Sequence, residues 1–418
     1  MSRVEKENYP NFLCDTWWYG LTQRLSDRKF EELARLRAKQ GFSAVQLVVG
    51  IPPEVGPENP NAASKIGPAW NLQGEFNEQY LDYARQRITF LNSVGLSVLV
   101  YGAWGQQIEW LGVEKMQDWW KKIVEKVDDL DVMYCLTGES DIWVGEEDKL
   151  LPGKTTEELN TVRLIPFLHP RLVYLAKRIV TAIADLLNQS KKTERRGKWS
   201  QVLSGVSVLT NKPIFIHVLS GITSQEAVNN PKLLSATTVQ TGHDPNSRRL
   251  LWQLPFKTTT ENSNSNFINL EPWYEGITNR FGVEDQLYAY WASMMGGADA
   301  YCYGAHGIWN AGDGKFLSHW GKQTLDQAMR LETPKLIGIS HKLFTESRFK
   351  DLKNIEIEAP MEELIRITRT DNRSQFVNFF PEVSLVKNLP EGNIFSPLKG
   401  EFIKIPPKTG PVVIISPK

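Results

Sequence analysis

The sequence has few cysteines, and none of them lies in a metal-binding or redox motif. Its 418 residues include only Cys14, Cys135 and Cys302, which are widely separated and lie in apolar surroundings. There is no CxxC pair, and the spacing suits neither a disulfide framework nor a zinc site. We therefore expect three buried packing residues, and we expect no bound metal or other cofactor.

Long apolar segments are also missing. No run of eighteen apolar residues occurs, which is about the length that a membrane-spanning helix needs. The opening "MSRVEKENYPNF" lacks the apolar region of a signal peptide. We expect a soluble, cytoplasmic protein without a membrane partner, or an exported one if a signal has been removed from this chain.

The chain has no excess of charge of either sign. Lysine plus arginine and aspartate plus glutamate both number 48, so the formal net charge is zero. Binding to a polyanion usually requires a basic surface. Nucleic acid and acidic membrane surfaces are therefore not expected as partners.

Aromatic residues, by contrast, are abundant: 14 Trp, 12 Tyr and 18 Phe. Several tryptophans stand beside polar residues, in "DTWWYG", "YGAWGQQIEW", "EPWYEG" and "GAHGIWN". Flat apolar rings next to hydrogen-bonding groups are surfaces on which sugar rings stack. For each tryptophan, packing in the core or at an interface is the alternative.

Short apolar runs alternate with amphipathic helical patterns along most of the chain, which indicates a parallel sheet. We expect eight strands, at residues 12–18, 44–52, 97–104, 131–140, 212–221, 235–243, 267–276 and 299–309. Helical patterns occur at residues 26–41, 77–95, 112–130, 169–189, 283–298 and 321–344. Eight strand-helix repeats make a (β/α)8, or TIM, barrel. The predicted fold class is therefore α/β, with such a barrel over residues 1–347.

The end of the chain has a different pattern. After about Glu346, apolar and polar residues alternate and are interrupted by Asn, Gly and Pro. This pattern predicts a small antiparallel, sandwich-like β domain at residues 348–418, whose expected role is to pack against the barrel. The charged segment "NQSKKTERRGKWSQ", residues 188–201, is expected to be a solvated loop before the fifth strand.

Two glutamates stand where predicted strands end. Glu139 follows the fourth strand in "LTGES", and Glu271 ends the apolar part of the seventh in "NLEPW". Active sites of these barrels lie at the carboxyl ends of the strands. Thr137 and Asn269, two residues before each glutamate, are polar, whereas the alternate positions are apolar. Both glutamates are therefore expected to point toward the barrel axis.

Two glutamates that face each other across a barrel mouth suit cleavage of a glycosidic bond. One carboxyl group must be protonated to donate to the leaving oxygen, and the other must be ionised to meet the developing positive charge. We predict Glu139 as the acid/base and Glu271 as the nucleophile. Metal sites and structural ion pairs use the same positions, so they remain alternatives.

Six motifs in a fixed order resemble the apiosidase-like glycoside hydrolases: "CDTWWYGL", "LRAKQGFSAVQLV", "YCLTGESD", "VQTGHD", "NLEPWYEG" and "YCYGAHGIWN". The similarity covers most of residues 10–345. It implies a (β/α)8 catalytic domain, often followed by a small β domain, and a retaining mechanism. It also implies an acid/base at Glu139, a nucleophile at Glu271, and an oligosaccharide or polysaccharide substrate.

Other residues near strand ends are candidates for sugar binding. Asp15 can hydrogen-bond a hydroxyl group, with a loop or cap contact as the alternative. His243 and His306 can orient the nucleophile or bind hydroxyls, or be structural. The expected stacking surfaces are Trp273, Tyr274 and Trp309. Further candidates are Trp17, Trp18, Gln46, Trp104 and Gln106.

Glu275 follows Pro272, which suits the point where a strand stops pairing. It is therefore expected in a loop beyond the strand, either in a supporting role toward substrate hydroxyls or an arginine, or as a solvated charge.

Two other functions stay open. A carbohydrate-binding barrel without catalysis would keep the aromatic residues, although retention of both glutamates argues against it. A metal-dependent hydrolase would use Asp15, His217, His243 and His306, although no HxH or HExxH pair is present.

Overall fold

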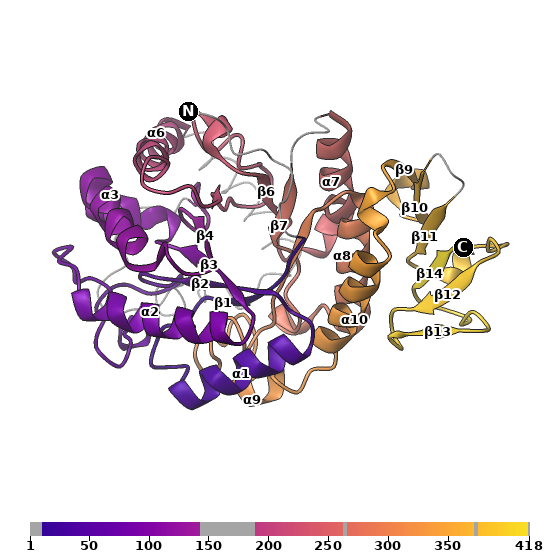
Figure 1. The fold of residues 1–418 in the computed structure, drawn as a ribbon, viewed down its shortest axis with the longest axis horizontal. Helices are drawn as coiled ribbons and strands as arrows, with labels where there is room; N and C mark the ends of the chain where they lie inside the picture. The colour runs from indigo at the N-terminus through magenta and orange to yellow at the C-terminus, as the bar shows by residue number, and fades with distance from the viewer. Residues whose placement is uncertain (1–10, 143–188, 262–265, 372–374, 417–418) are drawn as a thin grey trace, which may run out of the picture.

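The computed structural model describes residues 11–142, 189–261, 266–371 and 375–416. Figure 1 shows a large barrel, which the chain builds first, and a smaller sheet at its side, built from the C-terminal residues.

The barrel has eight strands: β1 (Leu13–Trp17), β2 (Ala44–Val48), β3 (Ser97–Tyr101), β4 (Val132–Cys135), β5 (Ile214–Phe215), β6 (Thr237–Gln240), β7 (Phe267–Glu271) and β8 (Ala300–Tyr303). Their order in the sheet is β5-β4-β3-β2-β1-β8-β7-β6, and neighbouring strands are parallel. Each predicted strand contains one of them, so the predicted TIM barrel is confirmed.

The barrel closes between β5 and β6 through individual hydrogen bonds. The backbone N–H of Ser235 donates to the carbonyl of Ile214 (2.9 Å), and the N–H of Ile214 donates back to the Ser235 hydroxyl (3.0 Å). The Thr238 hydroxyl donates to the carbonyl of Ile216 (2.5 Å). Two hydroxyl groups therefore take the place of a regular strand ladder at this seam.

The helices are α1 (Asp27–Lys39), α2 (Glu78–Ser93), α3 (Ile108–Val127), α6 (Gln189–Val206), α7 (Leu250–Glu261), α8 (Val283–Gly296), α9 (Leu325–Ala328) and α10 (Thr333–Glu346). Ser26 caps α1 by accepting a hydrogen bond from the N–H of Lys29. No helix in the described ranges is both long enough and apolar enough to cross a membrane.

The prediction of a loop at residues 188–201 is wrong, because α6 begins at Gln189. Trp199, Val202, Leu203 and Val206 are all buried, and their spacing places them on one helical face. Arg195 is also buried, four residues before Trp199, and it pairs with Glu109 of α3, as does Lys198. The many charged residues of this segment obscured its apolar pattern in the sequence. The helix predicted at residues 169–189 lies almost entirely outside the described residues.

Six strands form the second sheet: β9 (Asn354–Glu358), β10 (Arg366–Thr370), β11 (Phe376–Phe380), β12 (Asn393–Ser396), β13 (Glu401–Ile403) and β14 (Val412–Ile415). Their order is β13-β12-β14-β11-β10-β9, and all pairs are antiparallel. In the described residues they make one sheet. It packs on the barrel, with Phe379 and Phe395 against Trp291 of α8 at 6.1 and 6.2 Å between ring centroids.

Arg369 of β10 joins the sheet to the end of α8. Its buried guanidinium donates to the carbonyls of Met294 (2.8 Å) and Met295 (2.9 Å). The last carbonyls of a helix have no partner within the helix, and a cation there is favourable. Burial lowers the pKa of Arg369 to about 10.

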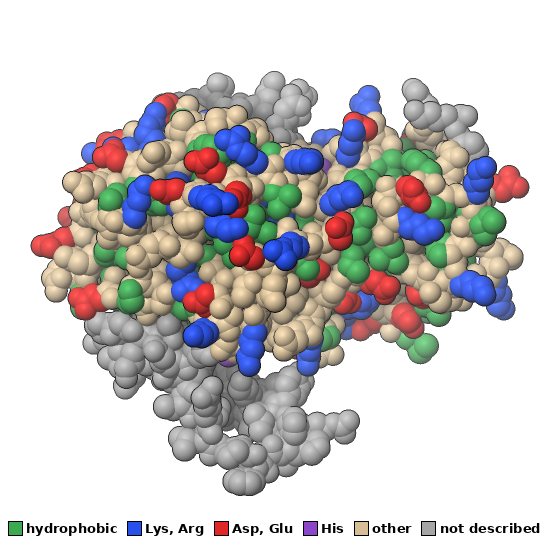
Figure 2. Space-filling model, turned by 90° about the horizontal axis from the view of Figure 1, so that it is seen from below, with side chains coloured by type: hydrophobic (Ala, Val, Ile, Leu, Met, Phe, Trp, Pro, Cys, Tyr) green, Lys and Arg blue, Asp and Glu red, His purple; other side chains and the backbone are tan. Residues whose placement is uncertain are grey.

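All three cysteines are free and buried, as predicted. On the face shown in Figure 2, positive and negative side chains are interspersed over the described surface, in keeping with the zero net charge.

Candidate active site

A cavity of about 150 Å³ lies among the segments that follow the barrel strands. Its lining includes both predicted catalytic glutamates and five of the predicted sugar-binding residues: Glu139, Glu271, Trp18, Trp104, His243, Tyr274 and Trp309. It also includes Pro53, Glu54, Gln240, Ile277 and Trp320, which the sequence did not single out.

Glu271 is the last residue of β7, and an irregularity in the strand places it. Val239 pairs with Asn269 and Gln240 pairs with Glu271, so Leu270 is an extra residue in the ladder. Bulges of this kind re-aim side chains and are frequent beside active sites. Here the bulge brings Gln240 level with Glu271.

Two histidine rings face the Glu271 carboxylate, and His243 is hydrogen-bonded to it. Nε2 of His243 lies 2.9 Å from Oε1, and Nε2 of His217 lies 3.5 Å from Oε2. Nδ1 of each ring accepts a backbone hydrogen bond: from Tyr274 N–H in His243 (3.4 Å), and from Glu139 N–H in His217 (3.1 Å). A ring nitrogen that accepts carries no proton, so both Nε2 atoms present N–H groups to the carboxylate.

Glu139 lies in the turn after β4, and it is held by polar contacts on two sides. Nε1 of Trp104 donates to Oε2 (3.0 Å), and Nε2 of Gln240 donates to Oε1 (3.3 Å). Burial, followed by the negative charge of Glu271, raises the pKa of Glu139 to about 8 in spite of these donors. Below that pH the carboxyl group holds its proton.

The backbone at Glu139 is unusual, and two glycines make room for it. Its φ of 40° is in the left-handed region, which is rare for residues other than glycine and clusters at functional sites. A Cβ on Gly105 would lie 2.0 Å from the Glu139 carbonyl oxygen, and one on Gly138 would lie 2.2 Å from the Trp104 ring. Close packing of these two glycines therefore fixes both Glu139 and its donor Trp104.

Aromatic rings wall the cavity. Trp18 packs edge-on against Trp104 with 5.2 Å between centroids, and Tyr274 lies 4.6 Å from His243 and 6.5 Å from Trp309. A Cβ on Gly304 would lie 2.2 Å from the Tyr274 ring, so only a glycine at this position lets the ring pack where it does.

Asp15 and Trp17 face the outer helices. Asp15 is fully buried in an ion pair with Arg37 of α1 (2.6 Å), and it also accepts from Nε1 of Trp17 (2.7 Å). Trp17 packs against Phe30 of the same helix. Neither residue lines the cavity.

Four more predicted residues lie outside the cavity lining. Gln46 spans the barrel interior and donates to the Leu270 carbonyl (2.9 Å). Gln106 is buried beside the start of α3. Trp273 is buried, stacks on Phe281, and donates to the Ser247 hydroxyl (2.9 Å). His306 is buried, and this burial lowers its pKa to about 4.

Glu275 is also outside the cavity lining. It accepts hydrogen bonds from the Tyr303 hydroxyl (2.5 Å) and the Thr333 hydroxyl (2.8 Å), and its pKa is raised by burial. The alternative of a solvated loop charge is wrong, because the side chain is enclosed between β8 and α10.

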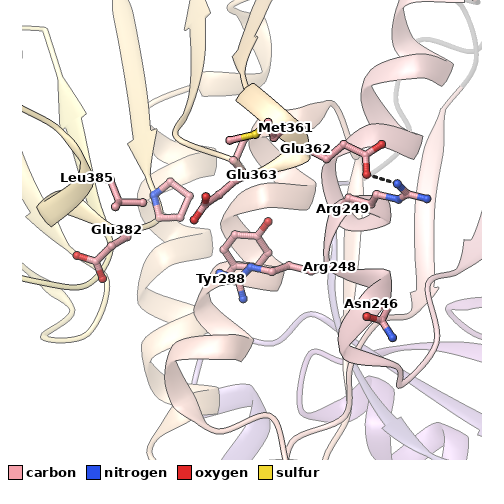
Figure 3. A pocket seen from close by; sticks show the side chains of 11 residues that line it. Asn246, Arg248, Arg249, Tyr288, Met361, Glu362, Glu363, Glu382 and Leu385 are labelled. Atoms are coloured by element: carbon pink, nitrogen blue, oxygen red, sulfur yellow. Dashed lines mark hydrogen bonds and ion pairs between the residues drawn. The ribbon is translucent and has the colours of Figure 1, made fainter. Parts of the chain in front are cut away.

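A second cavity, of about 550 Å³, lies between the barrel and the second sheet. Figure 3 shows Arg248 over the ring of Tyr288 and Arg249 paired with Glu362 across the interface. None of the predicted site residues lines it.

No group of three or more His, Cys, Asp or Glu side chains within the described ranges is arranged to hold a metal ion. Asp15 is engaged with Arg37, and His306 lies apart from His217 and His243, which both face Glu271. The four residues proposed for a metal-dependent hydrolase are therefore not brought together.

A (β/α)8 barrel with paired carboxyl groups and aromatic walls after its strands has the organisation of a glycoside hydrolase catalytic domain. Residues 4–351 match the family model described as "Apiosidase-like, catalytic domain". The chain belongs to the apiosidase-like family.

Solved structures share the fold. One described as "Glycoside hydrolase" is 13% identical, with a TM-score of 0.67, over 97% of this chain and 92% of the other. A glycoside hydrolase family 5 structure from Bacteroides vulgatus is 13% identical, with a TM-score of 0.66, over 97% and 89%. No curated protein matches the sequence.

Proposed function

We propose that the protein is a retaining glycoside hydrolase that acts on an oligosaccharide or polysaccharide, with Glu271 as nucleophile and Glu139 as acid/base. The observation that carries this proposal is the contrast between two carboxyl groups in one cavity. Glu139 is protonated below pH about 8, whereas Glu271 is hydrogen-bonded to the ring of His243 and faces the ring of His217.

In the first step, a Glu271 oxygen attacks the anomeric carbon while Glu139 donates its proton to the leaving glycosidic oxygen. The glycosidic bond breaks and a covalent glycosyl ester forms. In the second step, Glu139, now ionised, takes a proton from water, whose oxygen attacks the anomeric carbon and releases Glu271. Two displacements at one carbon retain its configuration.

The donors around each carboxyl group support these roles. The hydrogen bond between His243 and Glu271, together with the nearby ring of His217, fixes the position of the Glu271 carboxyl group for attack. Burial, followed by the charge of Glu271, favours the neutral form of Glu139 and outweighs its two donors. When Glu271 forms the glycosyl ester, it loses its negative charge. The pKa of Glu139 then falls, so that Glu139 can act as a base in the second step.

We also propose that the chain divides between residues 347 and 348. The family match ends at residue 351 and β9 begins at Asn354, which supports a division near this point. Packing against α8 is the proposed role of the second part.

A panel of 4-nitrophenyl glycosides and plant and bacterial polysaccharides would identify a substrate. On that substrate we expect Glu271→Gln to lower kcat by about a thousandfold or more while sugar binding persists. Glu58→Gln, at an exposed site, is the matched control. NMR of the first-formed product should show the anomeric configuration of the substrate. Full activity of Glu271→Gln, or an inverted product, would refute the proposal.

A further inference from the structure

We propose that a third carboxylate, Glu54, binds sugar hydroxyl groups in this cavity and makes the site selective for sugars without negative charge. This inference rests on the proposed function and concerns the same cavity.

Glu54 lies in the loop after β2, and neighbouring contacts fix this loop. The Tyr19 hydroxyl donates to the Pro53 carbonyl, and Nε2 of Gln107 donates to the carbonyl of Ile51 (2.9 Å). Pro53 and Glu54 both line the cavity. The loop is therefore a fixed part of the cavity wall.

The conformation of Glu54 is the second observation. Its φ of 70° is in the left-handed region, as is that of Glu139. Such a conformation is unfavourable for glutamate and persists only where the surroundings impose it, often at binding sites. Nε1 of Trp320, another residue of the cavity wall, lies 3.3 Å from Oε1 of Glu54 and donates to it.

Buried polar atoms without a protein partner point to a ligand in the same cavity. Among the described residues these include Oε1 of Gln240 and Nε1 of Trp309, and both side chains line the cavity. Buried polar groups in native proteins almost always have partners. A sugar supplies them, since each hydroxyl group both donates and accepts.

The charge of the cavity lining determines whether neutral or acidic sugars can bind. The described lining contains the carboxyl groups of Glu54, Glu139 and Glu271 and no lysine or arginine. Hydroxyl groups donate strong hydrogen bonds to a carboxylate. A sugar carboxylate would be repelled at short range, with little water between the charges. The cavity therefore accepts uncharged sugars and rejects uronic acids.

Binding of free monosaccharides tests the inference without relying on catalysis. We would measure binding of glucose, galactose, xylose and arabinose, and of glucuronate and galacturonate, by saturation-transfer NMR on the full chain. We expect at least one neutral sugar to bind and neither uronate to bind detectably. Tighter binding of a uronate than of any neutral sugar, or no binding by any of the six, would overturn the proposal.

Two substitutions then test Glu54 itself. Glu54→Gln keeps the size of the side chain and removes its charge, and we expect it to weaken neutral-sugar binding about tenfold and to narrow the preference over uronates. Trp320→Phe, which removes the donor to Glu54, should weaken binding less. Glu58→Gln, on an exposed residue of the same loop, should change nothing.

Folding and catalysis are controlled separately. If Glu54→Gln lowers the unfolding temperature, Glu54→Gly, which relieves the left-handed backbone, replaces it with the same expected loss of binding. Unchanged binding in a folded Glu54 variant would overturn this inference alone. Full activity of Glu271→Gln would instead overturn the proposed function, whatever Glu54 does.

Discussion

The backbone N–H of Glu139 donates to Nδ1 of His217, and Nε2 of the same ring faces the carboxylate of Glu271 at 3.5 Å. One buried ring thus contacts both the turn that carries one carboxyl group and the side chain of the other. Burial lowers the pKa of His217 to about 4, so the ring is neutral at neutral pH. It therefore orients the two glutamates without adding a positive charge.

His217 is therefore expected to be a positioning residue. We predict that His217→Gln lowers kcat about ten- to a hundredfold with a smaller change in KM, as for other partners that orient a reactive group. Because Glu139 loses the acceptor of its N–H group, the basic limb of the pH profile should also move. Kinetics across pH would check this, with the exposed His319→Gln as control. An unchanged pH profile would show a purely structural role.

The raised pKa of Glu139 predicts the alkaline limit of activity. An acid with a pKa of about 8 holds its proton below that pH, so kcat/KM should fall as pH rises through about 8. The hydrogen bond from Gln240 lowers this pKa and the charge of Glu54 raises it. Gln240→Leu should therefore move the basic limb upward, and Glu54→Gln should move it downward. Shifts of the same sign would contradict this account of the site.

Leaving groups distinguish the acid from the nucleophile. Without a proton donor, Glu139→Gln should lose about a hundred- to ten-thousandfold in kcat/KM on a natural glycoside, whose alkoxide leaves poorly. On a 2,4-dinitrophenyl glycoside, which needs no protonation, the loss should be much smaller. Rates on both substrates, with wild type and Glu271→Gln alongside, would show this. Equal losses on both would argue against Glu139 as the acid.

Asp15 is expected to affect stability and not activity. Removal of one partner from a buried ion pair leaves an unpaired charge, which typically costs about 3–5 kcal/mol. Asp15→Asn leaves the charge of Arg37 unpaired and should lower the free energy of unfolding by an amount of that order. At temperatures where the variant is folded, kcat/KM should be unchanged. Urea unfolding and kinetics would check this. A raised KM with unaltered stability would instead place Asp15 at the substrate.

Three buried histidines predict loss of stability in acid. Burial lowers the pKa of His217, His306 and His341 to about 4, whereas an unfolded histidine titrates near 6.5. Between these values the unfolded chain binds protons that the folded chain does not, so the free energy of unfolding should fall as pH drops from about 6.5 to about 4. His341→Gln should make the decline shallower, and His319→Gln should not. Urea midpoints of the wild type and both variants, measured between about pH 6.5 and 4, would show whether the slopes differ in this way.

The fold was largely predictable because strand length and helical spacing are local properties. Every barrel strand lies within a predicted one, although β5 has only Ile214 and Phe215. The misses came from competing signals: charge masked the buried stripe of α6, and Pro255 lies inside α7, which was not predicted.

The predicted set of site residues and the cavity lining overlap only in part. Strand phase, applied to β1 as it was to β4 and β7, would have separated the outward Asp15 and Trp17 from Trp18. Glu54 and Trp320 lie in loops, where no periodicity shows which way a side chain points. His217 was noted in the sequence, but its contact with Glu271 depends on tertiary structure.

The hydrogen bonds from Arg369 to the end of α8 also make the barrel depend on the second sheet. The carbonyls of Met294 and Met295 accept hydrogen bonds from a strand of the second sheet, 75 and 74 residues further along the chain. A barrel that lost this sheet would need a new ending for α8 and a new cover for Trp291. Removal of the sheet would therefore leave the end of α8 without these hydrogen bonds and would expose Trp291.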